Sequence, residues 1–223
     1  MPEAKEMLQM LGIVREVGVI GSLIASALIL LVRDWRVMLL ALLGQYVAVG
    51  FILSQLIPPE IALIKVLVGA LICPMLYLAA RQSGWSVLAK VDPAQQSFSK
   101  EVTGMRDPLP WTGLAFRALA LCLVFVLATV LIRDYPLPGA PPDVGLSCYW
   151  LMLVGVVVLM LSGQPLLAGP GLLTALTGFE LLYTLLESSL VIVFLLAGVN
   201  LLLTAAISYL AAIQGLNTLR EES

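Results

Sequence analysis

The stretch LTGFELLYTLLESSLVIVFLLAG, residues 176–198, decides the fold class, because it is apolar over the length of a membrane span. A transmembrane helix needs about 20 consecutive, predominantly apolar residues. Two glutamates, Glu180 and Glu187, interrupt this stretch far from either end. An ionisable side chain at that depth costs about 2.5–3.5 kcal/mol on insertion scales, and it normally faces protein or a water-filled cavity. The stretch therefore predicts a membrane helix whose polar face lies inside a larger helical assembly.

The composition extends this conclusion to the whole chain. Of its 223 residues, 61% are hydrophobic and only 12% are charged, whereas a soluble domain has about 25% charged residues. Several other runs are also long and apolar enough to span a bilayer. We therefore expect an all-α, polytopic membrane protein, with residues 1–223 forming a single integral membrane domain of about seven transmembrane helices.

The expected helices are separated by proline pairs, charged turns and one long polar loop at residues 81–111. The last two spans form a nearly unbroken apolar stretch, which we divide at the turn Gly198-Val199-Asn200 because no other plausible turn is visible. The predicted helices cover residues 12–32, 37–57, 60–80, 112–132, 146–163, 171–195 and 199–215.

Orientation follows from the distribution of lysine and arginine, which accumulate on the cytoplasmic side of membrane proteins. With an odd number of spans and an outside N-terminus, eight of these residues lie on the cytoplasmic side and three on the other. The eight are Arg33, Arg36, Arg81, Lys90, Lys100, Arg106, Arg117 and Arg220, and the three are Lys5, Arg15 and Arg133. We expect an outside N-terminus, with the 81–111 loop and the C-terminus in the cytoplasm.

The two glutamates are seven residues apart, so they project from one face of a helix, with Tyr183 and Thr184 between them. This stripe has two interpretations. Two buried carboxyl groups beside hydroxyl groups can form a path that gains and loses protons. Alternatively, each glutamate is permanently neutral and only holds helices together by hydrogen bonds.

Other polar residues inside the spans also have two interpretations. Lys65 either extends its long side chain to the membrane surface or pairs with a buried carboxylate on the ion path. Asn200, Thr204 and Ser208 recur every four residues on one helix face, which either binds a neighbouring helix or lines water. Gln45 is a further candidate for such a lining, although its signal is weak.

Residue types that are scarce exclude several classes of site. The chain has no histidine, which excludes haem held by paired histidines, imidazole metal sites and histidine proton shuttles. Its three cysteines are far apart and form no metal-binding spacing. Glycine-rich phosphate loops, nucleophile motifs and basic nucleic-acid patches are absent from the sequence. We expect no cofactor, no metal, no nucleic-acid partner and no catalytic site of the chain's own.

Two segments resemble a known family of small membrane proteins. Residues 171–198, followed by one more span, resemble the core of the K-type membrane protein of complex I and of its C-type counterpart in Mrp antiporters. Gly178-Phe179-Glu180 matches the Gly-hydrophobic-Glu element of these proteins. The segment IALIKVLVGALICPMLYLAAR, residues 61–81, and the seven-span layout resemble the E component of hydrogenase-4-type complexes. The chain departs from the K-type pattern in its second carboxylate, which is Glu187 rather than a glutamate on the following helix.

The resemblance implies a subunit of a membrane arm that moves protons or Na⁺, in a prokaryotic cytoplasmic (inner) membrane, beside antiporter-like and complex I-like subunits. Glu180 would be its principal carboxylate, with Lys65 a charge on the route. The chain would then be a non-catalytic part of a redox-driven oxidoreductase or of an antiporter. Two alternatives stay open: a structural or assembly subunit whose glutamates are buried contacts, and a free-standing small transporter.

Overall fold

The computed structural model describes residues 2–32, 34–82, 110–137, 141–162, 165–186 and 190–221, and these segments are helical almost throughout. They contain seven α-helices and no strand. The prediction of an all-α protein is confirmed. The helices are α1 (Pro2–Leu31), α2 (Trp35–Leu53), α3 (Pro59–Gln82), α5 (Pro110–Asp134), α6 (Pro142–Leu161), α7 (Pro165–Leu186) and α8 (Leu190–Glu221).

Within the described residues, six of the helices are long and apolar enough to cross a membrane. The exception is α7, whose 22 residues include Glu180, three threonines and three glycines. This helix packs against four others, α1, α2, α6 and α8, and its glutamate and three threonines are buried. Its polar side chains are therefore shielded from lipid by the apolar helices. The chain is a polytopic membrane protein whose α7 helix has its polar side chains buried against neighbouring helices.

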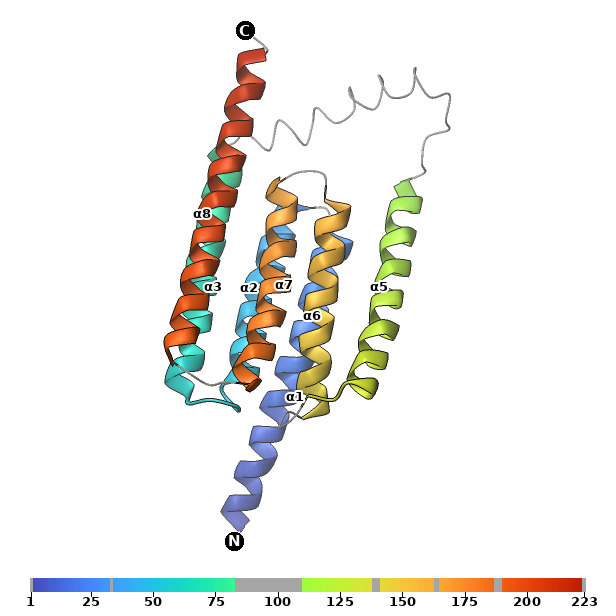
Figure 1. Ribbon diagram of the computed structural model, residues 1–223, viewed down its shortest axis with the longest axis vertical. Helices are drawn as coiled ribbons and strands as arrows, with labels where there is room; N and C mark the ends of the chain where they lie inside the picture. The colour runs from blue at the N-terminus through green and yellow to red at the C-terminus, as the bar shows by residue number, and fades with distance from the viewer. Residues whose placement is uncertain are drawn as a thin grey trace.

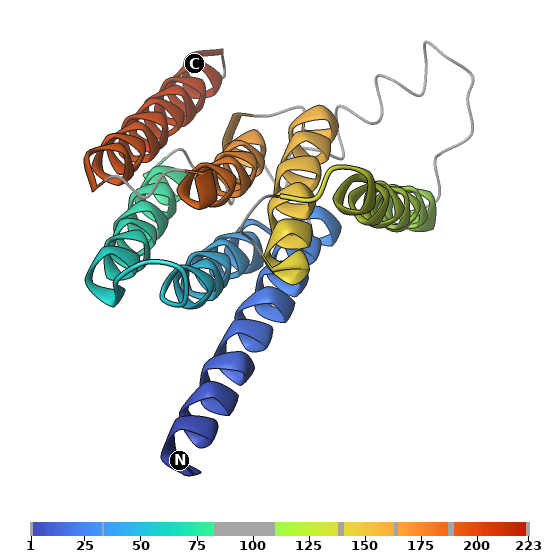
Figure 2. The ribbon, with the colours of Figure 1, turned by 60° about the horizontal axis from the view of Figure 1, so that its bottom comes forward.

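The helices form two facing rows (Figure 1, Figure 2). One row is α1, α2 and α3, and the other is α5, α6, α7 and α8. Across the two rows, α1 contacts α6, α2 contacts α7, and α3 contacts α8, while α5 contacts α6 at the edge. The chain ends lie at opposite ends of the bundle (Figure 1), as an odd number of alternating helices requires.

The boundary between the last two helices differs from the sequence prediction. The predicted turn at 198–200 lies inside α8, and α7 ends about three helical turns earlier, at Leu186. The sequence between the two helices is Glu187-Ser188-Ser189. Glycine is well tolerated in membrane helices, so Gly198 does not interrupt α8. The predicted span 171–195 is thus divided between α7 and α8.

Glycines bring α6 and α7 into direct backbone contact. A Cβ atom added at Gly155 of α6 would lie 2.3 Å from the backbone nitrogen of Ala175 and 2.6 Å from the carbonyl oxygen of Gly171, both on α7. A Cβ atom added at Gly178 of α7 would lie 2.7 Å from the backbone nitrogen of Met152 on α6. Small residues at such crossings allow helices in lipid to pack closely, where no hydrophobic effect holds them together. This contact fixes the position of α7.

Replacing Gly155 with alanine should destabilise the bundle, because the added methyl group meets main-chain atoms that cannot rotate away. Overpacking of this kind costs about 1–3 kcal/mol. Thermal unfolding of the purified protein in detergent measures the effect. Gly44→Ala on α2 is the matched control, since nothing lies within 4 Å of its added Cβ atom. Equal unfolding temperatures for the two variants would contradict the close α6–α7 contact.

Candidate functional site

The interior of the bundle holds one ion pair between two helices of different rows, among the residues that the structure describes. The ammonium group of Lys65 on α3 pairs with the carboxylate oxygen Oε2 of Glu180 on α7. Each of the two residues is only 7% exposed. Lys65 therefore does not extend to the surface, and Glu180 faces protein rather than lipid. A lone charge here would be expensive, and pairing makes its burial possible.

Asn200 of α8 completes the coordination of the carboxylate. Its side-chain amide Nδ2 donates a hydrogen bond of 2.5 Å to Oε1 of Glu180, so each carboxylate oxygen has its own partner. Asn200 is fully buried, and so is Thr204 one turn later, whose hydroxyl donates to the backbone oxygen of Asn200 at 2.8 Å. The predicted polar stripe of this helix thus faces α7 through Asn200.

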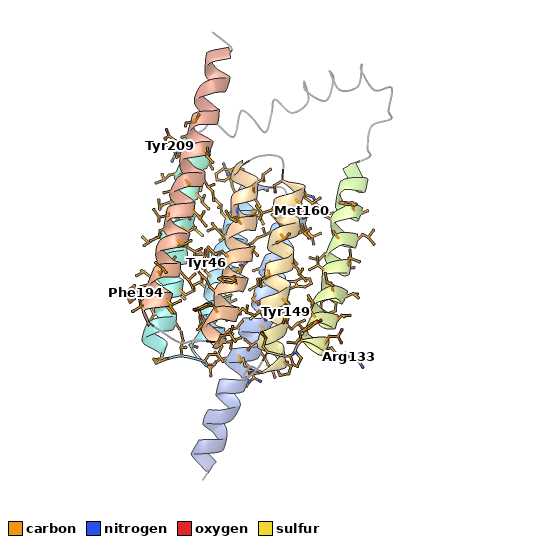
Figure 3. All side chains as sticks on the ribbon, in the orientation of Figure 1. Tyr46, Arg133, Tyr149, Met160, Phe194 and Tyr209 are labelled. Carbon is orange, nitrogen blue, oxygen red and sulfur yellow. The ribbon has the colours of Figure 1, made fainter. Side chains whose placement is uncertain are left out.

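Tyr46 of α2 supplies an aromatic wall that sequence reasoning missed. The ammonium nitrogen of Lys65 lies 4.9 Å from the centroid of the Tyr46 ring, which is a cation–π distance. Tyr46 is fully buried, and Figure 3 places it within the bundle. Gly69 of α3 admits the ring, because a Cβ atom added there would lie 2.5 Å from Tyr46. The available signal was a tyrosine in the middle of a span, since tyrosine is enriched at membrane interfaces instead.

These four side chains, Tyr46, Lys65, Glu180 and Asn200, form what we call the central cluster. They come from α2, α3, α7 and α8, the four helices that surround one half of the bundle interior. No two of them are close in sequence, and each helix contributes one residue. The fold therefore assembles a charged pair, an amide and a phenol at one buried place.

A small cavity adjoins the ion pair. It has a volume of about 30 Å³, which is sufficient for a water molecule. Its polar wall is formed by Lys65, Glu180 and Thr184. The remaining walls include Leu53 and Ile57 near the end of α2, and Val193 near the start of α8. The cavity therefore extends from the pair toward the end of the bundle at which α2 ends and α8 begins.

Polar groups continue from the cluster in the opposite direction. The hydroxyl group of Thr174 on α7 donates to the side-chain oxygen of Gln45 on α2 at 3.2 Å. The buried polar atoms that lack a hydrogen-bond partner among the described residues include Gln45 Nε2, Asn200 Oδ1 and Ser208 Oγ. Buried polar atoms are nearly always satisfied by protein or by ordered water. These atoms are thus suitable positions for water: Asn200 belongs to the central cluster, and Ser208 lies about two helical turns further along α8.

The remaining predicted site residues are placed differently. Thr184 is buried and donates to the backbone oxygen of Glu180 at 2.8 Å. Tyr183 is half-buried, and its ring packs 6.2 Å from that of Phe179 on the same helix. Glu187 lies outside the described residues. The predicted span 171–195 is not one continuous helix, and the observed partner of Glu180 is Lys65.

Comparisons with known proteins give no relative: no family model, curated protein or solved structure matches the chain.

The ion pair predicts strong energetic coupling between Lys65 and Glu180. Removing one partner leaves a buried charge uncompensated and typically costs about 3–5 kcal/mol, whereas removing both can be nearly neutral. We expect Lys65→Met and Glu180→Gln each to lower the unfolding temperature, and the double variant to lose less than the sum of the two. Thermal unfolding in detergent provides the double-mutant cycle. Additive losses would show that the two groups do not interact.

Proposed function

We propose that the chain is an ion-translocating membrane subunit of a larger complex, and that the Lys65–Glu180 pair lies on its proton path. The buried ion pair is the observation that carries the proposal, because ionisable residues within a membrane usually mark ion pathways or proton relays. The resemblance of Gly178-Phe179-Glu180 and of the Lys65 segment to complex I-like and hydrogenase-4-like proteins supports the same function.

A proton can move from one group of the pair to the other without changing the net charge of the pair. Transfer of the ammonium proton to the carboxylate converts a charged pair into a neutral amine and a neutral acid, and the sum of the charges is zero in both states. A proton that arrives from elsewhere at Glu180 breaks the ion pair and leaves Lys65 as the only charge. The cavity and the unpartnered polar atoms supply positions for the waters that such transfers require.

The same contact favours protons over Na⁺. A sodium ion is bound by several oxygen atoms, and Glu180 is the buried carboxylate available at the central cluster. Its oxygens are already occupied by the Lys65 ammonium and the Asn200 amide. A cation approaching this carboxylate would be repelled by Lys65 at short range.

Partner subunits would cover apolar faces that the bundle leaves outside. Only 11% of the residues in the membrane-spanning segment of α5 are buried, and only 17% of those in the segment of α8. Phe194 and Tyr209 lie on the outer face of α8 (Figure 3), and they are 60% and 68% exposed. These faces contact lipid in an isolated chain, and some of them would contact antiporter-like or complex I-like subunits in the proposed assembly.

A structural role is the competing proposal. The contacts of Glu180 with Lys65 and Asn200 join α7 to α3 and α8, and such contacts can simply hold membrane helices together. The two functions differ in whether the proton of Glu180 has to move. A substitution that keeps the shape and removes the titratable group separates them.

Glu180→Gln is that substitution. Under the proposed function, membrane vesicles that contain the variant complex in the same amount as wild-type vesicles should lose most of their pH gradient, because glutamine carries no titratable acid proton. Quenching of a pH-gradient-sensitive dye measures the gradient. Glu16→Gln is the matched control, since Glu16 is exposed on α1. A wild-type gradient in the Glu180→Gln vesicles would refute the translocation role and leave the structural one.

The orientation that belongs to this proposal has an outside N-terminus and a cytoplasmic C-terminus. A reporter enzyme that is active only in the cytoplasm, fused after Ser223, should therefore be active, while one that is active only outside should be silent there. The basis is the excess of lysine and arginine at the C-terminal end of the bundle. Activity of the exported reporter at this position would reverse the orientation.

A further inference from the structure

A hollow lies at one end of the bundle, between the first turn of α2 and the last turn of α3. Its volume is about 380 Å³. The two helices run antiparallel, so the start of α2 meets the end of α3 at the same level. The residues that line the hollow are Trp35, Arg36, Tyr77, Ala80 and Arg81.

Two arginines give the hollow a positive charge. Arg36 and Arg81 are both exposed, and the ion pairs of the described residues, Arg15–Asp143 and Lys65–Glu180, involve neither of them. The carboxylate of Asp34, just before α2, accepts a hydrogen bond of 3.0 Å from the backbone N–H of Arg36 and caps this helix. Among the described residues, the lining of the hollow therefore has two guanidinium groups and no carboxylate.

Aromatic rings form most of the remaining lining. The rings of Trp35 and Tyr77 lie 5.5 Å apart, and the Arg36 guanidinium lies 5.3 Å from the centroid of the Trp35 ring. Tryptophan and tyrosine are enriched at the level of lipid headgroups, where one part of the ring system is wet and the other apolar. A small inorganic anion makes no favourable contact with these aromatic rings, whereas a phospholipid packs its glycerol region and first methylene groups against them.

We propose that this hollow binds the phosphate headgroup of an anionic phospholipid. The guanidinium groups of Arg36 and Arg81 donate charge-assisted hydrogen bonds to the phosphate oxygens. Trp35 and Tyr77 contact the glycerol and upper acyl region. Basic hollows between transmembrane helices are recognised binding places for such headgroups, particularly on the side rich in lysine and arginine. The site is separate from the central cluster, and it does not depend on the proposed function.

The test measures lipid binding to the purified full chain by native mass spectrometry, with phosphatidylglycerol and phosphatidylcholine as probes. We expect the wild-type chain to bind phosphatidylglycerol more tightly than phosphatidylcholine. Arg36→Gln and Arg81→Gln should each weaken phosphatidylglycerol binding about five-fold, and the double variant about 25-fold, given the usual contribution of one basic residue near an anionic lipid.

Arg133→Gln is the matched control, because Arg133 is an exposed arginine at the other end of the bundle, on α5 (Figure 3). It should leave the affinity unchanged. A large excess of inorganic phosphate should not displace the lipid. Equal binding of both lipids, an equal loss in Arg133→Gln, or displacement by phosphate would each overturn the proposal, and the last outcome would indicate a site for small anions instead.

Discussion

The pairing of Lys65 with Glu180 is the interaction on which the interior of this bundle depends. Burying either charge alone between apolar helices would be costly. The helices must therefore be arranged so that the ammonium and carboxylate groups pair. The two charged groups also contact side chains of two further helices. Asn200 of α8 donates a hydrogen bond to the second carboxylate oxygen, and the Tyr46 ring of α2 faces the ammonium group. The pair thereby specifies the mutual arrangement of four helices, which apolar packing in lipid specifies only weakly.

The close α6–α7 contact determines which way Glu180 points. Each residue of an α-helix advances by about 100°, so Gly178 and Glu180 lie about 200° apart around α7. Gly178 lies against the backbone of α6, and Glu180 therefore projects to the other side of α7, toward α3 and α8. The spacing of the two residues therefore has a structural consequence. The contact at Gly178 sets the rotation of α7 about its axis, and this rotation directs Glu180 toward α3 and α8.

Much of the fold was predictable because it follows from patterns that are local in the sequence. The fold class and the approximate position of most helices follow from apolar runs and proline-containing turns, and the burial of Glu180 follows from the cost of exposing it to lipid. The division between α7 and α8 was not predictable in this way, because a glycine and an asparagine resemble a turn, while the observed role of Asn200 is a contact across helices. Tyr46 was missed for the same reason: its importance comes from Lys65, which lies on another helix.

The surroundings of the ion pair are asymmetric, and this asymmetry bears on how a proton would reach it. On the side where α2 ends and α8 begins, a cavity large enough for water touches both charged groups. On the other side, buried hydroxyl and amide groups, including Thr204 and the Thr174–Gln45 contact, continue the polar surface. In the proposed orientation the cavity lies on the outer side of the pair. A proton leaving Glu180 outward would therefore enter water directly, whereas one arriving from the cytoplasm would need the hydroxyl groups or inserted water to reorganise.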